Sequence, residues 1–370
     1  MKAYVLNGVS QLNYMDVEEP ELKEGWALVQ VGAAGICESD VPRIYRTGTY
    51  HFPTIPGHEF AGKVVKVCDE ENSSWIGKRV GIFPLIPCRE CFVCKEGRYE
   101  MCRNYDYLGS RRDGGFAEYV AVPVWNLIEL PEKMLMEEGA MLEPASVARH
   151  AVQRLEVTEM DTVALFGLGT IGILITQWLR MRGVNHLYAV GHHEKHGEIM
   201  RQTASEGYEY YNDVTVDGVS VLQNNGGSNG EKAGDAVDWI MEKTGGIGVS
   251  IAIDCVGSAE SFKNCLNAVK PGGQILIVGN PKGDMELDKA SYWKILRNQI
   301  RLTGTWNSTF NHSAEDDWHK VIEACCEGSL KLTELITHRH PFEELERGLL
   351  IARDKSEYRN KIVTIFKSEK

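Results

Sequence analysis

The sequence predicts an α/β protein in which a small β-rich domain precedes a doubly wound parallel sheet. Up to about residue 147, apolar runs such as 26–31 and 62–67 follow a strand pattern and are separated by Gly, Pro and Asn. From about residue 148, apolar strands alternate with helical stretches, as in a parallel sheet with crossover helices. A chain of 370 residues is also longer than one hydrophobic core usually serves. We therefore expect two domains.

The domain boundaries are predicted where these patterns change. The expected domains are a β-rich domain at 1–147, a parallel-sheet domain at 148–298, and a return to the first domain at 299–370. Strands are expected at 161–166, 186–190, 251–256, 273–278 and, to close the chain, 361–366.

One stretch of the second domain differs in composition from the rest. Residues 213–235 are rich in Gly, Asn and Ser, and such a composition cannot bury much apolar area. We predict a mobile surface insertion here. A functional lid is the alternative.

Charge and hydropathy exclude several classes of partner. The formal net charge of -12 disfavours nucleic acid and anionic membranes, because both require basic patches. No apolar run approaches the length of a bilayer span, and the first residues begin as a strand rather than as a secretion signal. Ten cysteines in such a chain indicate reduced thiols. We expect a soluble, cytoplasmic protein.

Four cysteines form the most specific motif in the sequence. Cys88, Cys91, Cys94 and Cys102 are spaced C-x2-C-x2-C-x7-C, and two-residue gaps allow successive thiolates to turn toward one point. Four thiolates satisfy tetrahedral zinc and leave no open position, so the pattern predicts a structural zinc site. Unliganded thiols or an iron–sulfur cluster are the alternatives. The remaining cysteines are expected to be core or incidental surface residues: Cys68, Cys255, Cys265, Cys325 and Cys326.

A second candidate metal site lies nearer the N-terminus. A zinc ion held by one thiolate, one imidazole and one carboxylate keeps a fourth position for water or substrate, as a catalytic metal must. Cys37 and His58 offer the first two ligand types. Taken alone, one cysteine and one histidine twenty residues apart are more often packing residues. The surrounding motifs make the metal site the stronger interpretation.

A glycine-rich turn predicts a dinucleotide site. Gly167, Gly169, Thr170, Ile171 and Gly172 lie between the apolar strand 161–166 and the amphipathic segment 173–180. In this context the glycines permit a tight turn and a close approach of a pyrophosphate to the helix N-terminus. The motif is weak in isolation but is strong evidence between a strand and a helix.

The end of the next strand bears on the choice between NAD and NADP. An acid is expected there to bind the adenosine ribose, but strand 186–190 ends in Gly191. The absence of an acid removes the repulsion of a 2′-phosphate. His192, His193 or Lys195 could donate a hydrogen bond to that phosphate, which favours NADP over NAD. The alternative is that the histidines are merely exposed and that Glu194 reaches the ribose.

Together these motifs resemble the zinc-dependent medium-chain dehydrogenase/reductase family, in its sorbitol dehydrogenase branch, over essentially the whole chain. The resemblance is carried by the four-cysteine lobe, the glycine-rich turn, Cys37-x-Ser39-Asp40, Gly57-His58-Glu59 and Glu143-Pro144. It implies a GroES-like β-rich catalytic domain plus a Rossmann domain, and a homodimer or homotetramer joined through edge strands of the latter. It also implies two zinc ions per chain, with the catalytic one held by Cys37, His58 and Glu143 and with Glu59 as an exchangeable neighbour.

The resemblance further implies hydride transfer between a hydroxyl-bearing substrate and NAD or NADP. The proton would leave through the hydroxyl of Ser39, and Asp40 would accept the second ring N–H of His58. A local turn with side-chain-to-backbone bonds is the alternative for both residues. Gly279 would let backbone groups touch the nicotinamide carboxamide, and a plain strand-end turn is compatible with that role.

The expected substrate is a polyol or a polyol phosphate. A phosphate requires cationic donors, for which Arg43, Arg111 and Arg112 are the candidates. They could instead brace a loop or pair with surface acids, and an unphosphorylated polyol stays open. Aromatic residues that could line an apolar wall are Trp306, Tyr50 and Phe52. A non-catalytic zinc protein with this fold is the competing class, although it would be expected to lose Cys37, His58 or Glu143.

Overall fold

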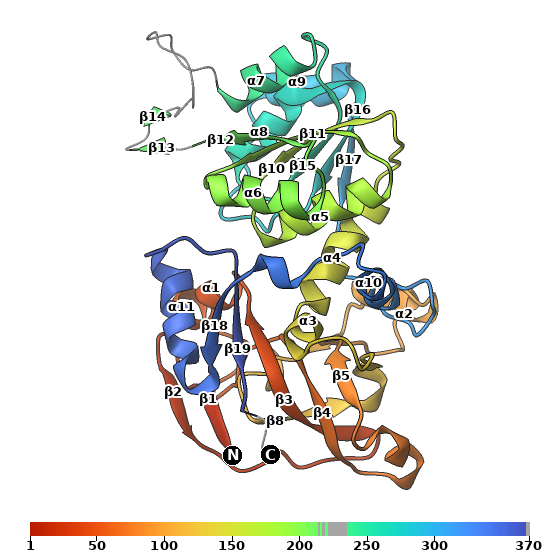
Figure 1. The fold of residues 1–370 in the computed structure, drawn as a ribbon, viewed down its shortest axis with the longest axis vertical. Coiled ribbons are helices and arrows are strands. Elements are labelled where there is room, and N and C mark those ends of the chain that lie inside the picture. Colours follow the sequence, from red (N-terminus) through yellow and green to blue (C-terminus); the bar gives the residue numbers. More distant parts are fainter. Residues whose placement is uncertain (214, 217–218, 221–234, 368–370) are drawn as a thin grey trace. The chain divides into compact units, whose positions relative to one another are not determined.

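The computed structural model describes residues 1–213, 215–216, 219–220 and 235–367, which form two compact units. Unit 1 comprises Met1–Ser146 and Asn307–Lys370, and unit 2 comprises Val147–Trp306 (Figure 1). The predicted return to the first domain at residue 299 is too early. Strand β17 (Arg301–Gly304) still pairs with β16 (Val269–Ile277). The chain therefore remains in unit 2 until residue 306.

Unit 1 is built on a seven-stranded sheet. Its strands follow the order β18-β19-β3-β4-β5-β9, with β8 paired to β3. The strands of the unit are β1 (Lys2–Leu6), β2 (Leu12–Asp16), β3 (Trp26–Ile36), β4 (Glu59–Val67), β5 (Arg79–Ile82), β6 (Leu85–Ile86), β7 (Asp106–Tyr107), β8 (Tyr119–Pro123), β9 (Leu127–Glu129), β18 (Ile336–Pro341) and β19 (Lys361–Ile365). Its helices are α1 (Asp40–Pro42), α2 (Phe92–Lys95), α3 (Met136–Ala140), α10 (Asp317–Cys326) and α11 (Leu345–Asp354). Helix α4 (Leu142–Gln153) carries the chain into unit 2.

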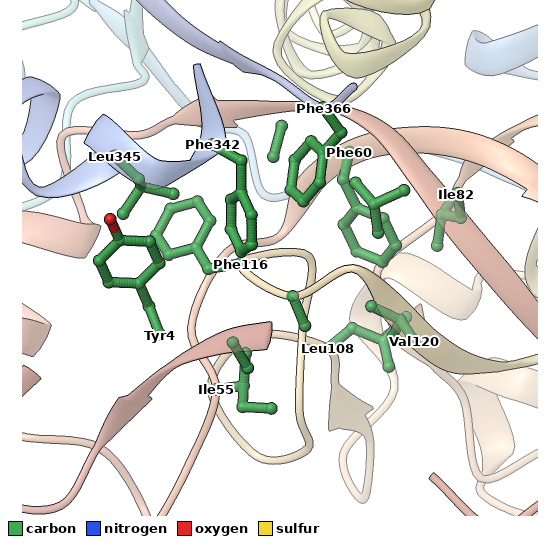
Figure 2. Packing of buried hydrophobic residues seen from close by; sticks show 14 of the residues in the cluster. Tyr4, Ile55, Phe60, Ile82, Leu108, Phe116, Val120, Phe342, Leu345 and Phe366 are labelled. Atoms are coloured by element: carbon green, nitrogen blue, oxygen red, sulfur yellow. The ribbon is translucent and has the colours of Figure 1, made fainter. Parts of the chain in front are cut away.

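The core of unit 1 joins both ends of the chain. Phe342 and Phe366, from the C-terminal segment, stack with ring centroids 4.1 Å apart and lie among N-terminal core residues such as Phe60 and Phe116 (Figure 2). Phe342 is 4% exposed and Phe366 is 7% exposed. Burial of these aromatic side chains removes a large apolar area from water, so the C-terminal segment is an integral part of this unit.

Unit 2 is a parallel sheet in the order β12-β11-β10-β15-β16-β17 (Figure 1). The chain leaves the middle of the sheet in both directions, which is the doubly wound arrangement predicted from the sequence. Its remaining strands are β10 (Thr162–Phe166), β11 (His186–Gly191), β12 (Glu209–Asn212) and β15 (Val249–Asp254). Its helices are α5 (Thr170–Met181), α6 (Glu194–Thr203), α7 (Ala236–Lys243), α8 (Ala259–Ala268) and α9 (Lys289–Arg297).

Burial of the central strands of unit 2 fits the parallel arrangement of its sheet. All six residues of β15 are buried, as expected for a strand covered by helices on both faces. Helices α5 and α6 pack together, and α7, α8 and α9 form a second packed group. The strands with their crossover helices therefore account for the alternating pattern seen after residue 148.

Two predictions from the sequence concern the surface of the chain. Most of the predicted insertion at 213–235 lies outside the described residues, which include only the short antiparallel pair β13 (Thr215–Val216) and β14 (Val219–Ser220). Within the described part of the chain, no helix combines the length and the apolar character that crossing a bilayer requires.

Replacement of Phe342 tests whether the C-terminal segment is part of the core. We expect Phe342→Ala to lower the free energy of unfolding by about 3–5 kcal/mol, because it leaves a cavity beside Tyr4 and Phe366. The control Ile76→Ala, at a side chain that is 52% exposed, should change it by less than about 0.5 kcal/mol. Equal, small effects of both substitutions in urea denaturation would show that the segment does not stabilise the unit.

Candidate functional site

The register of β3 and β4 creates the first site. These strands pair antiparallel with Gly35 opposite Glu59, so Cys37, just after β3, lies beside the start of β4. Ligand atoms of Cys37, His58 and Glu59 lie within 4.8 Å of one another. His58 and Glu59 are buried, whereas Cys37 is partly exposed. A thiolate, an imidazole and a carboxylate that converge beside an accessible face fit a zinc ion with one open position.

Asp40 organises the two ligands nearest to it. Its buried carboxylate accepts the backbone N–H of Cys37 at 3.0 Å and lies 3.4 Å from Nδ1 of His58, while Arg43 donates to it at 3.0 Å. The bond to Cys37 closes a local turn, and the contact to His58 places the carboxylate where it could orient the imidazole. Burial opposes a charged ring, but Asp40 and Cys37 outweigh it and raise the pKa of His58 well above its usual value. The negative field behind this shift favours a cation at the site.

A buried cation that the sequence analysis missed completes this site. Lys361, the first residue of β19, forms an ion pair with Glu59, and both side chains are buried. Burial opposes the charged amine, but Glu59 and Cys37 raise the pKa of Lys361. Gly35 leaves the space that this pair occupies, since a Cβ at that position would meet both side chains. The pattern at 361–366 predicted the strand but gave no signal for the partner of its first residue.

Glu143, the carboxylate implied as the third ligand, is buried beside this cluster and interacts with the charges of His58 and Glu59. The carboxylate grouped with Cys37 and His58 is Glu59, whereas Glu143, from α4, accepts a hydrogen bond from the Tyr107 hydroxyl at 3.3 Å. Burial, aided by the charge of Glu59, raises the pKa of Glu143 to about 7. Tyr107, a second residue that the sequence analysis missed, also lies against His58 with ring centroids 5.9 Å apart.

The predicted proton-transfer residue lies beside the thiol ligand. The Ser39 hydroxyl donates to Sγ of Cys37 at 3.2 Å, and its backbone N–H approaches the same sulfur at 3.5 Å. Ser39 is partly exposed, unlike the neighbouring Asp40, which is fully buried. Its hydroxyl is thus placed between the metal-ligand cluster and solvent, where it can pass a proton outward.

The second candidate metal site is formed by the four-cysteine lobe. Ligand atoms of all four residues lie within 4.8 Å of one another, with Cys94 and Cys102 buried. All the described cysteines are free thiols, and backbone N–H groups support the cluster, as Cys88 donates to Sγ of Cys102 at 3.2 Å. Hydrogen bonds from the backbone of Arg103 and Cys94 lower the pKa of Cys91 to about 6. Four thiols, one of them readily ionised, fit a closed tetrahedral zinc site.

The glycine-rich turn of unit 2 has the geometry that a pyrophosphate requires. Gly167 follows β10 with φ +98°, a conformation that L side chains rarely adopt, and its missing Cβ avoids Val256. Gly172 packs against the carbonyl of Gly167, whereas Gly169 faces open space at the N-terminus of α5. Thr170 and Ile171 begin that helix. An anion at Gly169 would lie at the positive end of the α5 dipole.

Packing also explains why residue 191 is a glycine, which the sequence did not reveal. A Cβ at Gly191, the last residue of β11, would lie 2.9 Å from the Tyr210 hydroxyl. That hydroxyl accepts the backbone N–H of His193 at 3.1 Å and donates to its carbonyl at 2.8 Å. Nδ1 of His192 lies 2.5 Å from the carbonyl of Asp213, and Glu194 pairs with Arg201 at 3.2 Å. Glu194, the alternative ribose ligand, is therefore paired with Arg201 of the same helix.

Gly279 lies where two strand-end turns meet. It follows β16, and a Cβ there would collide with the backbone N of Gly257. Asp254, the buried last residue of β15, fixes this junction by accepting N–H groups of Val256 and Gly257 and the hydroxyl of Ser261. Gly167, Gly191 and Gly279 therefore all lie at the carboxyl edge of one parallel sheet, where ligands of such sheets bind.

Known protein families share these features. The description "Alcohol dehydrogenase GroES-like domain" matches residues 23–132, and "Zinc-binding dehydrogenase" matches residues 170–327. The galactitol 1-phosphate 5-dehydrogenase of Escherichia coli strain K12 is 28% identical over 335 residues, which are 89% of this chain and 90% of that protein. The chain belongs to the zinc-dependent medium-chain dehydrogenase/reductase family. It is an oxidoreductase of that family, and the predicted family is confirmed.

Solved structures of medium-chain dehydrogenases confirm the predicted fold class. The crystal structure of galactitol-1-phosphate dehydrogenase from Escherichia coli superimposes with a TM-score of 0.83 at 27% identity, covering 99% of this chain and 100% of that one. A putative zinc-binding dehydrogenase from Sinorhizobium meliloti 1021, bound to NADP, gives 0.82 at 26% identity and 98% coverage of both chains. The GroES-like and Rossmann parts expected from the sequence are therefore both present.

The three candidate arginines have different surroundings in this dehydrogenase. Arg43 is paired with Asp40, and Arg112 with Asp106, its NH2 group lying 2.6 Å from that carboxylate. Arg111 instead lies over the rings of Tyr50 and Tyr105. Of the proposed apolar wall, the most exposed members are Tyr50 at 66% and Trp306 at 53%. Phe52 is 41% exposed, and Trp306 belongs to unit 2.

Two serine variants test the division of roles between the metal sites. We expect Cys37→Ser to abolish turnover, lower the zinc content from about two ions per chain to about one, and leave thermal stability almost unchanged. Cys91→Ser should mainly destabilise the protein, because a structural zinc contributes directly to folding. Metal analysis combined with calorimetry measures both effects. Equal unfolding of the two variants would contradict this division.

Proposed function

We propose that the protein is an NAD(P)-dependent zinc dehydrogenase that interconverts a secondary alcohol of a polyol, or of a polyol phosphate, and the corresponding ketose. The observation that carries this proposal is the cluster of Cys37, His58 and Glu59, which is buried except at the thiol and has the Ser39 hydroxyl beside it. A closed four-cysteine site and a dinucleotide turn in the same chain support it. A non-catalytic zinc protein would not need this hydroxyl next to an open ligand set.

Several residues of unit 1 would have separate roles in this reaction. When bound, zinc would favour ionisation of a substrate hydroxyl, and a nicotinamide would accept the hydride. Cys37 and His58 would hold the metal, with Glu143 or Glu59 as the third ligand. Asp40 orients the imidazole, Lys361 neutralises Glu59, and Ser39 carries the proton away from the substrate. The four-cysteine lobe would hold a second zinc ion that fixes its loop.

The proposed coenzyme is NADP rather than NAD. The last residue of β11 lacks a carboxylate, and Glu194, the nearby acid, is paired with Arg201. Without a carboxylate on the last residue of β11, the repulsion that excludes a 2′-phosphate is weaker, and His192, His193 and Lys195 are the candidate donors to it. The Sinorhizobium meliloti relative is described as bound to NADP, which agrees with this choice.

The proposed substrate is a polyol phosphate, and the reaction would take place in the cytoplasm. The similarity to a galactitol 1-phosphate 5-dehydrogenase supports this substrate class, and the free thiols of all ten cysteines fit a reducing compartment. An unphosphorylated polyol such as sorbitol is the alternative substrate. The overall acidity of the chain favours that alternative slightly.

A substrate panel tests the proposed function. Polyols and their 1-phosphates are incubated with zinc-loaded protein and with NAD or NADP, and formation of the reduced coenzyme is followed at neutral pH. We expect turnover with a polyol phosphate and at least a tenfold (~1.4 kcal/mol) higher kcat/KM with NADP than with NAD. Protein that contains about two zinc ions per chain and oxidises none of these alcohols would contradict the proposal.

We also propose that the dehydrogenase is a homodimer joined through β17. This strand ends the parallel sheet, and three of its four residues are exposed: Arg301, Leu302 and Gly304. Helix α9 of the same unit has no buried residue and exposes Tyr292 and Leu296 by about two thirds. An edge strand flanked by exposed apolar side chains can pair with the same strand of a second copy across a twofold axis.

Charge at the strand edge tests this dimer. We expect Leu302→Glu to convert the dimer to a monomer, because the twofold axis would place two carboxylates close together. The matched control Leu302→Met keeps the apolar character and should remain dimeric. Light scattering coupled to size exclusion measures both masses, and a wild-type monomer, or a dimeric glutamate variant, would refute this interface.

A further inference from the structure

We propose that Arg111 is the residue that selects a phosphorylated substrate, by binding the phosphate group of the polyol phosphate. This inference rests on the proposed function and makes it more specific, because it assigns one guanidinium to the anionic end of the substrate. Three arginines in the sequence were candidates for this role. The structure separates them by their partners.

Arg43 and Arg112 are already neutralised. Arg43 lies 3.0 Å from Asp40, and Arg112 lies 2.6 Å from Asp106. A guanidinium in a carboxylate pair would have to lose that partner before it could bind a phosphate in the bidentate way. Arg111, in contrast, has no carboxylate within ion-pair distance in the part of the chain that the structure describes.

Two tyrosines hold Arg111 in place. Its guanidinium carbon lies 4.1 Å from the ring centroid of Tyr50 and 4.5 Å from that of Tyr105. Burial opposes the charged guanidinium, but hydrogen bonds with Tyr50 and Tyr105 raise the pKa of Arg111. The Nε atom is buried and has no hydrogen-bond partner, so Arg111 retains an unused donor.

The backbone around Arg111 is also fixed in advance. The Arg111 carbonyl lies 3.0 Å from Nε2 of His51, and Thr49 donates to the neighbouring carbonyl of Ser110. The two segments that meet here are anchored by Ile55 and Leu108, which both lie in the core of unit 1 (Figure 2). Little conformational entropy would therefore be lost when an anion binds.

A short connection joins Arg111 to the metal-ligand cluster. The Arg111 N–H donates to the carbonyl of Tyr107 at 2.9 Å, and the Tyr107 hydroxyl donates to Glu143 while its ring lies against His58. The ring of Tyr105 lies 6.2 Å from that of Tyr107. One loop thus carries both a residue beside the metal ligands and the unneutralised guanidinium.

Two methionine variants test this assignment. Met keeps much of the length of the arginine side chain but removes its charge, and Arg112→Met is the matched control at the adjacent, neutralised position. We expect Arg111→Met to lower kcat/KM for a polyol phosphate at least tenfold (~1.4 kcal/mol), mainly through KM, and to leave the same polyol without phosphate unaffected. Arg112→Met should leave both values close to those of the wild type. Arg111→Lys should restore part of the loss, since it keeps the charge without the bidentate fork.

A binding measurement separates this inference from the proposed function. Inorganic phosphate is titrated into each protein in a calorimeter, without substrate or turnover. We expect binding to the wild type and to Arg112→Met and its loss in Arg111→Met. If no polyol is oxidised but this pattern is seen, the proposed function fails and the anion site stands.

Three results would overturn the assignment. The first is phosphate binding that is unchanged in Arg111→Met. The second is an equal loss of activity on phosphorylated and unphosphorylated polyols, which would show that Arg111 only braces its loop. The third is a wild-type preference for the matching sugar acid over the phosphate, which would identify a carboxylate as the anion bound.

Discussion

The antiparallel pairing of β3, β4 and β19 is the constraint on which the rest of unit 1 depends. Gly35 pairs with Glu59 on one side and with Val363 on the other, so residues from three distant segments meet at one point. Cys37 and His58 extend from the ends of these strands, and Lys361 opens the third. A shift of one residue in either register would turn these side chains to the opposite face and disperse the ligand set.

Charge compensation explains how so many ionisable groups can be buried together. Glu59 is balanced by Lys361, and Asp40 is balanced by Arg43 and lies beside His58. Removal of one partner would leave an unpaired buried charge, which is among the most costly changes in a protein interior. Glu143 is the exception, since burial raises its pKa to about 7 and its hydrogen bond comes from a neutral tyrosine. A metal cation would supply the positive charge that Glu143 lacks.

Local sequence patterns predicted the parts of this protein whose chemistry is local. The four cysteines and the turn from Gly167 to Gly172 are set by short spacings, and the structure brings each group together. Contacts between distant segments were not predictable in the same way. The Lys361–Glu59 pair and the Tyr210 hydroxyl over Gly191 depend on strand register, which no local pattern records. The domain boundary was misplaced for the same reason, because β17 is identified only by its pairing with β16.

X-ray absorption at the zinc edge tests the central claim most directly, because it reports the ligands of both metal sites at once. Zinc-loaded protein should show sulfur atoms at about 2.3 Å from zinc and nitrogen or oxygen atoms at about 2.0 Å. In Cys37→Ser the nitrogen and oxygen shell should largely disappear, leaving the four-sulfur site. A spectrum that is sulfur-only in the wild type, or unchanged in the variant, would contradict an open metal site at Cys37 and His58.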